Sequence, residues 1–243
     1  MTSDIVDLNN VPCDINLFGG KAVTLSKIHG HGLSVPHGFV VSSNCYHYYI
    51  HDMLNYDDFS VAVNNWLDKI GITNECIVRS SANVENTTEH DCPGIFESYV
   101  CHDRKNIIQV IKRVWDSTTA DLAHSFFLNS LDTNALRMAV IVQHIIRGNY
   151  NLVIQSYDVI EDKNRAIIEY CNGELNSIVD DIQNASLCYI DYNQKELTGC
   201  PLDLPLEHIK KDCKLIETII GGKAEIEAQI ENGKIWYLQA RLI

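Results

Sequence analysis

The stretch Ala224–Ile243 closes the chain and reads AEIEAQIENGKIWYLQARLI. Two runs of alternating polar and apolar residues flank Asn232-Gly233, and this arrangement predicts a β-hairpin. A two-residue Asn232-Gly233 loop would mix polar and apolar side chains on both faces. A three-residue loop, Glu231 to Gly233 with the glycine as a bulge, would separate them. Because a half-buried sheet selects the separated register, the pattern favours the three-residue loop.

The favoured register gives each face of this hairpin its own chemistry. The apolar face consists of Ile226, Ala228, Ile230, Trp236, Leu238, Ala240 and Leu242. The polar face consists of Glu225, Glu227, Gln229, Tyr237, Gln239 and Arg241. Carboxylate and amide oxygens suit Mg²⁺, and an arginine fork suits phosphoryl oxygens. The hairpin alone leaves two interpretations open, a solvated face with a rim ion pair and a site for Mg²⁺ and a polyphosphate.

The composition narrows the class of protein. The 243 residues suffice for one large domain or for two lobes with their own cores. With 46% hydrophobic and 21% charged residues, the chain is ordinary for a globular protein. The net charge of −13, without a run of Lys or Arg, argues against nucleic acid and anionic membranes as partners. An ATP-binding protein can carry this charge if its basic residues converge locally.

The cysteines and the termini bear on the compartment. Nine cysteines, without any Cys-x-x-Cys, predict reduced thiols and not a disulfide framework or a zinc site. The N-terminus lacks a basic-then-apolar signal, and no stretch approaches the ~18 apolar residues of a membrane span. We therefore expect a cytoplasmic protein.

Near the N-terminus, a glycine turn leads into a helix. Phe18-Gly19-Gly20-Lys21 precedes apolar residues at helical spacing, which Gly30 and Gly32 close. Lys21 therefore lies where backbone N–H groups attract anions, and its charge adds to that attraction. The signal is weak, because a Walker A motif is absent and two glycines before a lysine are common.

Further along, helices dominate before residue 125 and strands after residue 138. A helix from Ser42 or Ser43 carries His47 and His51 four residues apart, a spacing that can chelate a metal but for which we see no third ligand. The stretch 76–82 reads as a buried strand containing Arg79, followed by a polar loop with the character of a flap. The change in composition suggests an α+β fold of two lobes, residues 1–130 and 131–243, with a cleft between them.

Several stretches together resemble one family, the N-terminal ATP-grasp module of pyruvate phosphate dikinase and phosphoenolpyruvate synthase. The similar stretches, in the family's order, are Gly19-Gly20-Lys21, Gly32–Phe39, Val78–Ala82, Gly94–Tyr99, Val140–Gln143, Glu225–Glu227 and Leu238–Arg241. Each stretch alone is weak, whereas the ordered series spans the chain. The resemblance implies an ATP-grasp fold, in which ATP and Mg²⁺ bind between two lobes. It favours the phosphate interpretation of the polar hairpin face.

The resemblance also implies residue roles on the phosphate side of the nucleotide. Lys21 and Arg79 match basic residues that hold the ATP phosphates, and Arg241 matches a phosphate-contacting arginine. These three would be the catalytic residues, since phosphoryl transfer needs positioning and charge neutralisation more than covalent help. Gly94 matches the glycine of the loop that folds over the phosphates.

The remaining implied roles concern adenine and the metal. Gln143 and the backbone through Ile145 match the strand that borders adenine. Glu227 and Gln239 match metal and nucleotide positions. Glu225, the third residue expected at the metal site, stands where the family often has aspartate.

The sequence departs from the family in two respects. The family's Gly-Leu-Gly-Glu stretch appears only as Cys171-Asn172-Gly173-Glu174, and none of the ten histidines has the Ser-His context of a phosphorylated histidine. We therefore expect a phosphotransferase that passes a phosphoryl group to a phosphohistidine domain on another chain or to a small-molecule acceptor. A non-catalytic ATP sensor or scaffold, or a domain excised from a longer protein, remains as an alternative.

Overall fold

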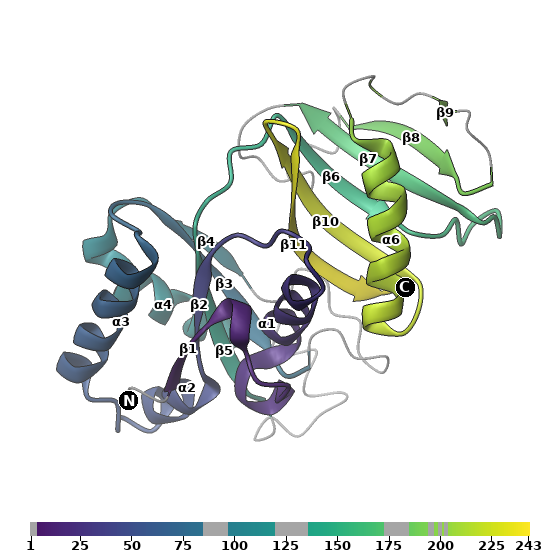
Figure 1. Ribbon diagram of the computed structural model, residues 1–243. Helices are drawn as coiled ribbons and strands as arrows, with labels where there is room; N and C mark the ends of the chain where they lie inside the picture. The colour runs from purple at the N-terminus through teal and green to yellow at the C-terminus, as the bar shows by residue number, and fades with distance from the viewer. Residues whose placement is uncertain are drawn as a thin grey trace. The chain divides into compact units, whose positions relative to one another are not determined.

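The structure, a computed structural model, describes residues 4–84, 97–119, 136–172, 185–193, 197–198, 201 and 204–243 (Figure 1). The chain divides into two compact units. Unit 1 comprises Met1–Ser26 and His37–Ile145, and unit 2 comprises Lys27–Pro36 and Ile146–Ile243. The boundary that the sequence predicts between residues 130 and 131 lies outside the described residues and stays a prediction.

Unit 1 contains a five-stranded antiparallel sheet in the order β1-β2-β5-β3-β4. Its strands are β1 Ile5–Asp7, β2 Gly38–Val41, β3 Cys76–Ala82, β4 Ser98–Cys101 and β5 Met138–Gln143. Strands β2, β3 and β5 are almost fully buried along their length. β2 and β5 read as nearly continuous apolar runs, as strands covered on both faces do, whereas β3 carries the buried polar residues Arg79, Ser80 and Ser81.

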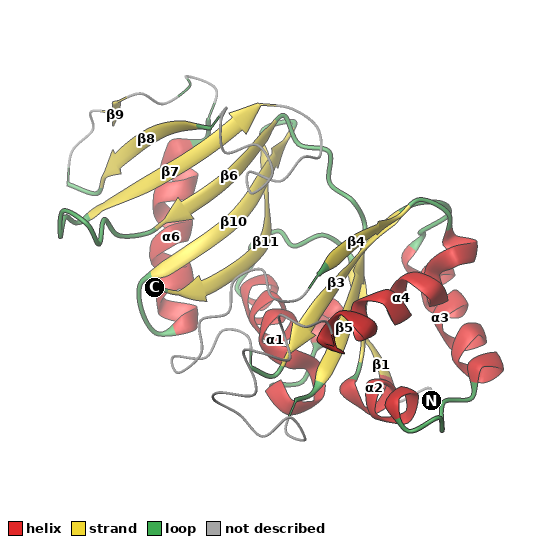
Figure 2. Cartoon of the chain, turned by 180° about the vertical axis from the view of Figure 1, so that it is seen from behind, coloured by secondary structure: helices red, strands yellow, loops and turns green. Residues whose placement is uncertain are grey.

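Helices on one face of this sheet build the core of unit 1 (Figure 2). These helices are α2 Ser43–Ile50, α3 Tyr56–Ile70 and α4 Ile107–Asp116, with 3₁₀ turns Leu8–Asn10, Arg104–Asn106 and Ser117–Thr119. Helix α1, Ile15–Gly30, contacts the other face of the sheet, through hydrogen bonds with the Ser81 hydroxyl. Alternate strand residues such as Val78 and Val140 pack with Phe59 of α3 and Trp115 of α4. The amphipathic pattern of residues 107 to 127 predicts one helix; α4 covers it as far as Asp116, a 3₁₀ turn follows, and the part beyond Thr119 lies outside the described residues.

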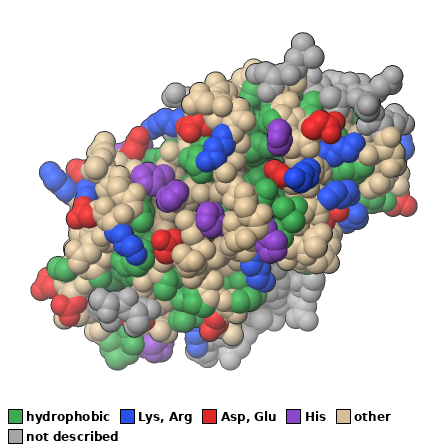
Figure 3. Space-filling view, in the orientation of Figure 1, with side chains coloured by type: hydrophobic (Ala, Val, Ile, Leu, Met, Phe, Trp, Pro, Cys, Tyr) green, Lys and Arg blue, Asp and Glu red, His purple; other side chains and the backbone are tan. Residues whose placement is uncertain are grey.

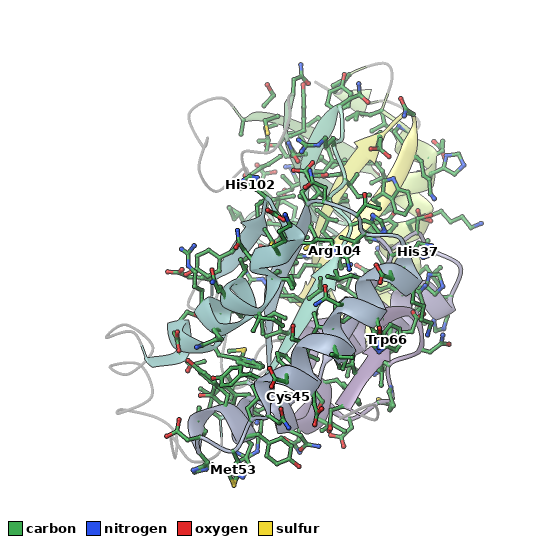
Figure 4. All side chains as sticks on the ribbon, turned by 90° about the vertical axis from the view of Figure 1, so that its left-hand side faces the viewer. His37, Cys45, Met53, Trp66, His102 and Arg104 are labelled. Carbon is green, nitrogen blue, oxygen red and sulfur yellow. The ribbon has the colours of Figure 1, made fainter. Side chains whose placement is uncertain are left out.

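Arg104, labelled in Figure 4, ties the end of α3 to the loop before α4. Its guanidinium donates to the Asp68 carboxylate at 2.7 Å, to the Ile72 carbonyl at 3.2 Å and to the Asn64 side chain at 3.2 Å. The arginine thereby satisfies polar groups where α3 gives way to the loop before β3.

Unit 2 contains a six-stranded antiparallel sheet in the order β11-β10-β6-β7-β8-β9. The strands are β6 Tyr150–Gln155, β7 Arg165–Asn172, β8 Ser186–Asp191, β9 Leu197–Thr198, β10 Ala224–Glu231 and β11 Lys234–Leu242. Helix α6, Leu206–Ile220, packs on β10 and β11. Its buried residues Ile209, Cys213 and Ile216 provide the apolar side of that layer.

The terminal hairpin is present, but its turn differs from the prediction. Glu231 pairs with Lys234, so the loop has two residues, Asn232-Gly233, and the expected three-residue loop is wrong. Both loop residues have positive φ, 52° and 78°, as the type I′ turn of a tight hairpin requires. The register shifts instead inside the strands, between Glu227 and Ala228, where β11 holds Leu238 as one extra residue.

This interior bulge reconciles a tight turn with separated faces. On the far side of the bulge from the turn, Glu225 pairs with Arg241 and Glu227 with Gln239, so these polar residues share a face, as predicted. On the turn side, the alternation of β11 is inverted. Tyr237 is therefore buried on the apolar face and Trp236 is not, opposite to the prediction. A bulge shifts the alternation by one residue, which explains the exchange.

The cysteines also correct one expectation. Cys188 of β8 is disulfide-bonded, whereas all nine cysteines were expected to be reduced. Cys45, Cys76, Cys101, Cys171 and Cys213 are free and buried, and Cys13 is free and exposed. Burial raises the pKa of Cys45 and of Cys76 to about 12, so both thiols remain protonated at neutral pH.

The surface in Figure 3 shows basic and acidic side chains interspersed over the face in view. Within the described part of the chain, no helix combines the length and the apolar character needed to cross a bilayer.

Candidate functional site

The glycine turn before Lys21 is fixed to strand β3 of unit 1. Gly19 (φ 76°, ψ 163°) interrupts α1, in a backbone region that is essentially restricted to glycine. The Ser81 hydroxyl of β3 accepts the Ala22 N–H at 3.0 Å and donates to the Phe18 carbonyl at 2.8 Å. A Cβ on Gly19 would overlap the Ser81 carbonyl oxygen. The turn and the strand therefore fit only with glycine at position 19.

This arrangement places Lys21 in the first turn of the helix that follows Gly19. Lys21 and Arg79 are only 7% and 8% exposed, although lysine and arginine are seldom so buried. Arg79 precedes Ser81 by two residues in β3, so both point to the same face of the sheet. Two buried cations and a helix start together create a positive environment of the kind that binds phosphate.

Gln143, the last residue of β5, lies on the same face of the sheet as Arg79. It is 1% exposed and pairs with Gly38 on one side and Ile77 on the other. A Cβ on Gly38 would lie 2.6 Å from the Gln143 side chain, so glycine leaves room for that side chain. The half-buried Ile145 follows β5, and Gly94 lies outside the described residues. Unit 1 thus carries Lys21, Arg79 and Gln143 on one face.

Unit 2 brings its four predicted residues together on the polar face of the hairpin. Nε of Arg241 donates to Oε1 of Glu225 at 2.8 Å, Nη2 forms an ion pair with the same oxygen at 2.7 Å, and the side chains are 16% and 21% exposed. Glu225 therefore fixes the orientation of the guanidinium. Glu227 pairs directly with Gln239, and both are half-buried. This second pair offers carboxylate and amide oxygens, a donor set suited to Mg²⁺ that keeps waters and phosphate oxygens as its other ligands.

A hydrogen-bonded cluster holds the start of β10, next to Glu225. The Ser156 hydroxyl accepts the Ala224 N–H at 2.8 Å and donates to Glu217 of α6 at 2.7 Å, and Lys214 and Lys223 also contact Glu217 at 3.0 and 3.2 Å. Burial raises the pKa of Glu217, but these hydrogen bonds outweigh burial and hold the pKa below its ordinary value. The carboxylate therefore stays ionised at neutral pH and keeps α6 and β10 together.

Among the residues that the structure describes, histidines and cysteines form no alternative metal centre. His47 and His51 are edge-to-face, with ring centroids 4.5 Å apart. Within the described ranges, no three His, Cys, Asp or Glu side chains are grouped so that they could hold a metal ion. A metal ion bound by the described residues would need additional ligands, such as phosphate oxygens and water. Mg²⁺ in proteins commonly has such ligands.

Sequence reasoning missed two supporting residues. Ser81 was quoted only as part of a motif, and no local pattern connects it to a carbonyl 63 residues earlier. Tyr237 was placed on the polar face, yet its hydroxyl donates to Asp212 of α6 at 2.6 Å. Burial, with a further contribution from Asp212, raises the pKa of Tyr237 far above its usual value, so the phenol remains a donor.

Comparisons with known proteins agree with this fold. The family model described as "Pyruvate phosphate dikinase, AMP/ATP-binding domain" matches residues 56–199, more than half of the chain. A comparison with curated proteins found no match. Among solved structures, an L-amino acid ligase from Bacillus licheniformis is similar with a TM-score of 0.50 and 13% identity, over 93% of this chain and 43% of the ligase.

A D-alanine–D-alanine ligase from Bacillus anthracis is also similar, with a TM-score of 0.45 and 13% identity, over 91% of this chain and 55% of the ligase. The chain thus spans about half the length of these two ligases. At such identities the likeness concerns the fold alone.

Proposed function

The chain belongs to the family described as "Pyruvate phosphate dikinase, AMP/ATP-binding domain", and we propose that it is an ATP- and Mg²⁺-dependent phosphotransferase. Its fold is the α+β ATP-grasp fold, and the family to which it belongs binds ATP. The observation that carries the proposal is the Glu225–Arg241 pair beside Glu227 and Gln239, on one face of the hairpin. A simple solvated face would not need a guanidinium held against one carboxylate oxygen by a hydrogen bond and an ion-pair contact.

In this proposal, each residue has the role that the family resemblance implies. Lys21, Arg79 and Arg241 neutralise the phosphates, and Gly94 belongs to the loop that folds over them. Gln143 and the backbone through Ile145 border adenine.

Mg²⁺ would be held by Glu227 and Gln239. Glu225 is the weaker candidate ligand, because its Oε1 already accepts a hydrogen bond from Nε of Arg241 and forms an ion pair with Nη2. When bound, Mg²⁺ neutralises phosphate charge and orients the phosphoryl oxygens. The chain's own groups align the polyphosphate and keep the guanidinium fixed where negative charge develops during transfer.

The phosphoryl acceptor is either a histidine on a separate phosphohistidine domain or a small molecule. We favour the histidine slightly, on the grounds of the family resemblance. The small acceptor would have to approach the phosphates opposite Arg241.

Mg²⁺-ATP is expected to raise the melting temperature of the protein. A ligand that binds only the folded state stabilises it by about 2.7 kcal/mol at ~100 times its Kd. For a chain of this length, that corresponds to a Tm increase of roughly 5–10 °C. Differential scanning fluorimetry with Mg²⁺-ATP, ATP plus EDTA, and Mg²⁺ alone measures it. An unchanged Tm at millimolar Mg²⁺-ATP would contradict ATP binding.

The nucleotide products distinguish the two acceptors. Transfer to a histidine domain of the dikinase type is expected to give AMP and inorganic phosphate, slowly for the protein alone and quickly with the partner domain. Direct transfer to a small acceptor is expected to give ADP. Chromatography of the nucleotides, with and without candidate partners, measures the outcome. The Lys21→Ala variant controls for contaminating ATPases.

Two results would change the proposal. ADP formed with a small acceptor and no partner would overturn transfer to a histidine domain. Binding of Mg²⁺-ATP without any turnover, across the partners tested, would favour the non-catalytic sensor or scaffold.

A further inference from the structure

The segment Gly32–Pro36 resembles the family but has no role in the site described above. It follows α1, whose end is closed by a left-handed glycine, Gly32 (φ 87°). Gly32 N–H donates to the His29 carbonyl at 2.9 Å, and Leu33 N–H to the Ile28 carbonyl at 3.4 Å. This pair of bonds is the Schellman arrangement, which ends the helix and fixes the direction in which the chain leaves it.

The segment then runs beside the free edge of β11, within unit 2. β11 is the first strand of the six-stranded sheet, so one of its edges has no strand partner in the described part of the chain. The Ser34 carbonyl accepts the N–H of Tyr237 at 2.8 Å, and the neighbouring Val35 is buried. The segment thus contacts the edge at the residue that directly precedes the bulge at Leu238.

Tyr237 is held at two points. Its backbone N–H reaches Ser34, and its phenol donates to Asp212 of α6 at 2.6 Å. The side chain is buried between β11 and the helix and pairs across the hairpin with Ala228. Tyr237 is therefore the anchor of the strand on the turn side of the bulge.

The bulge decides which face receives the polar residues. If the register of the Asn232-Gly233 turn continued without it, Gln239 would pair with Ile226 and turn toward the apolar face. Arg241, two residues further, would follow it. One extra residue at Leu238 instead places Gln239 opposite Glu227 and Arg241 opposite Glu225.

We propose that Ser34 and Asp212 clamp Tyr237 and thereby position Gln239 and Arg241 for Mg²⁺-ATP. Tyr237 is in this view a positioning residue, and the Gly32–Pro36 segment is a strap for the bulged strand. The effect of the clamp on Mg²⁺-ATP binding rests on the proposed function, but the clamp itself can be tested without nucleotide.

Removal of the Tyr237 hydroxyl tests its contact with Asp212 of α6 in the clamp. Tyr237→Phe is expected to weaken Mg²⁺-ATP binding about tenfold, because a hydrogen bond to a carboxylate is lost and the bulge loosens. Tyr192→Phe is the matched control, since it removes another tyrosine hydroxyl of unit 2, which donates to the Ser156 carbonyl at 2.8 Å. We expect this control to change Tm but not the Kd measured by calorimetry. Asp212→Asn, which retains an acceptor, should bind Mg²⁺-ATP nearly as tightly as the wild type.

Distortion of the strap tests the clamp from the other side. Gly32→Val places a β-branched residue at positive φ, with no atom within 4 Å to clash, so the strain falls on the segment itself. Gly71→Val is the control, because Gly71 is also at positive φ in open space, at the end of α3. The Tyr237 amide should exchange about tenfold faster in Gly32→Val only.

Cross-strand nuclear Overhauser contacts between Glu227 and Gln239 report the register directly, with or without nucleotide. We expect them to weaken in Tyr237→Phe and in Gly32→Val. Unchanged contacts, exchange and affinity in both variants would overturn the proposal. If the wild type fails to bind Mg²⁺-ATP, the proposed function is wrong, and the exchange and register measurements still decide whether the clamp exists.

Discussion

Lys21→Ala and Arg241→Ala are each expected to lower ATP turnover by about a thousandfold, the scale of groups that stabilise charge in phosphoryl transfer. Lys21 lies at the helix start behind Gly19, and Arg241 is oriented by a hydrogen bond and an ion pair to Glu225. Alanine removes the positive charge at each position. Steady-state kinetics with Mg²⁺-ATP, together with Tm, measures the effect.

Each variant has a control in which a lysine elsewhere in the same element is replaced. The control distinguishes the effect of the charge at the site from the effect of the protein's net charge. Lys27→Ala removes an exposed lysine from the same helix, and Lys234→Ala removes an exposed lysine from the same strand. Turnover in these two controls should stay near the wild-type rate. If Lys21→Ala and Arg241→Ala instead melt early and keep their specific activity, the two residues are structural.

Local signals were enough to predict most of the elements. Apolar residues at helical spacing predicted the helix that follows the glycine turn, and the Asn-Gly pair predicted the final hairpin. Both depend on residues close together in the sequence. The expected turn was wrong because a tight loop and separated faces were treated as alternatives, whereas one interior bulge satisfies both.

The hairpin sequence alone could not predict the position of that bulge, because the residues that hold it lie elsewhere in the chain. Tyr237 is anchored by Asp212, 25 residues earlier, and by Ser34, in a segment before β2. The unit 1 part of the site has the same character, since Ser81 fixes the Gly19 turn across more than 60 residues. The roles of the candidate residues came from the family resemblance and stay predictions until ligand binding is measured.

Gly19→Ala is expected to cost roughly 3–5 kcal/mol of unfolding free energy, among the largest effects of a single substitution. Two causes add. The backbone at φ 76° and ψ 163° is essentially restricted to glycine, which contributes about 1–3 kcal/mol. A Cβ would also overlap the Ser81 carbonyl, a backbone atom of a buried strand that cannot move without disturbing β3. Urea unfolding monitored by circular dichroism measures the change.

Gly71→Ala is the control for a positive φ in open space. Gly71 has φ 76° and ψ 23°, in the left-handed region, and a Cβ there meets nothing within 4 Å, so its cost should be only about 1–2 kcal/mol. In Gly19→Ala, the fraction that remains folded should also bind Mg²⁺-ATP weakly, because the turn that places Lys21 has moved. Equal losses of stability in the two variants would show that β3 accommodates the added carbon. The glycine turn would then not be locked to Ser81, and the position of Lys21 would have to depend on α1 alone.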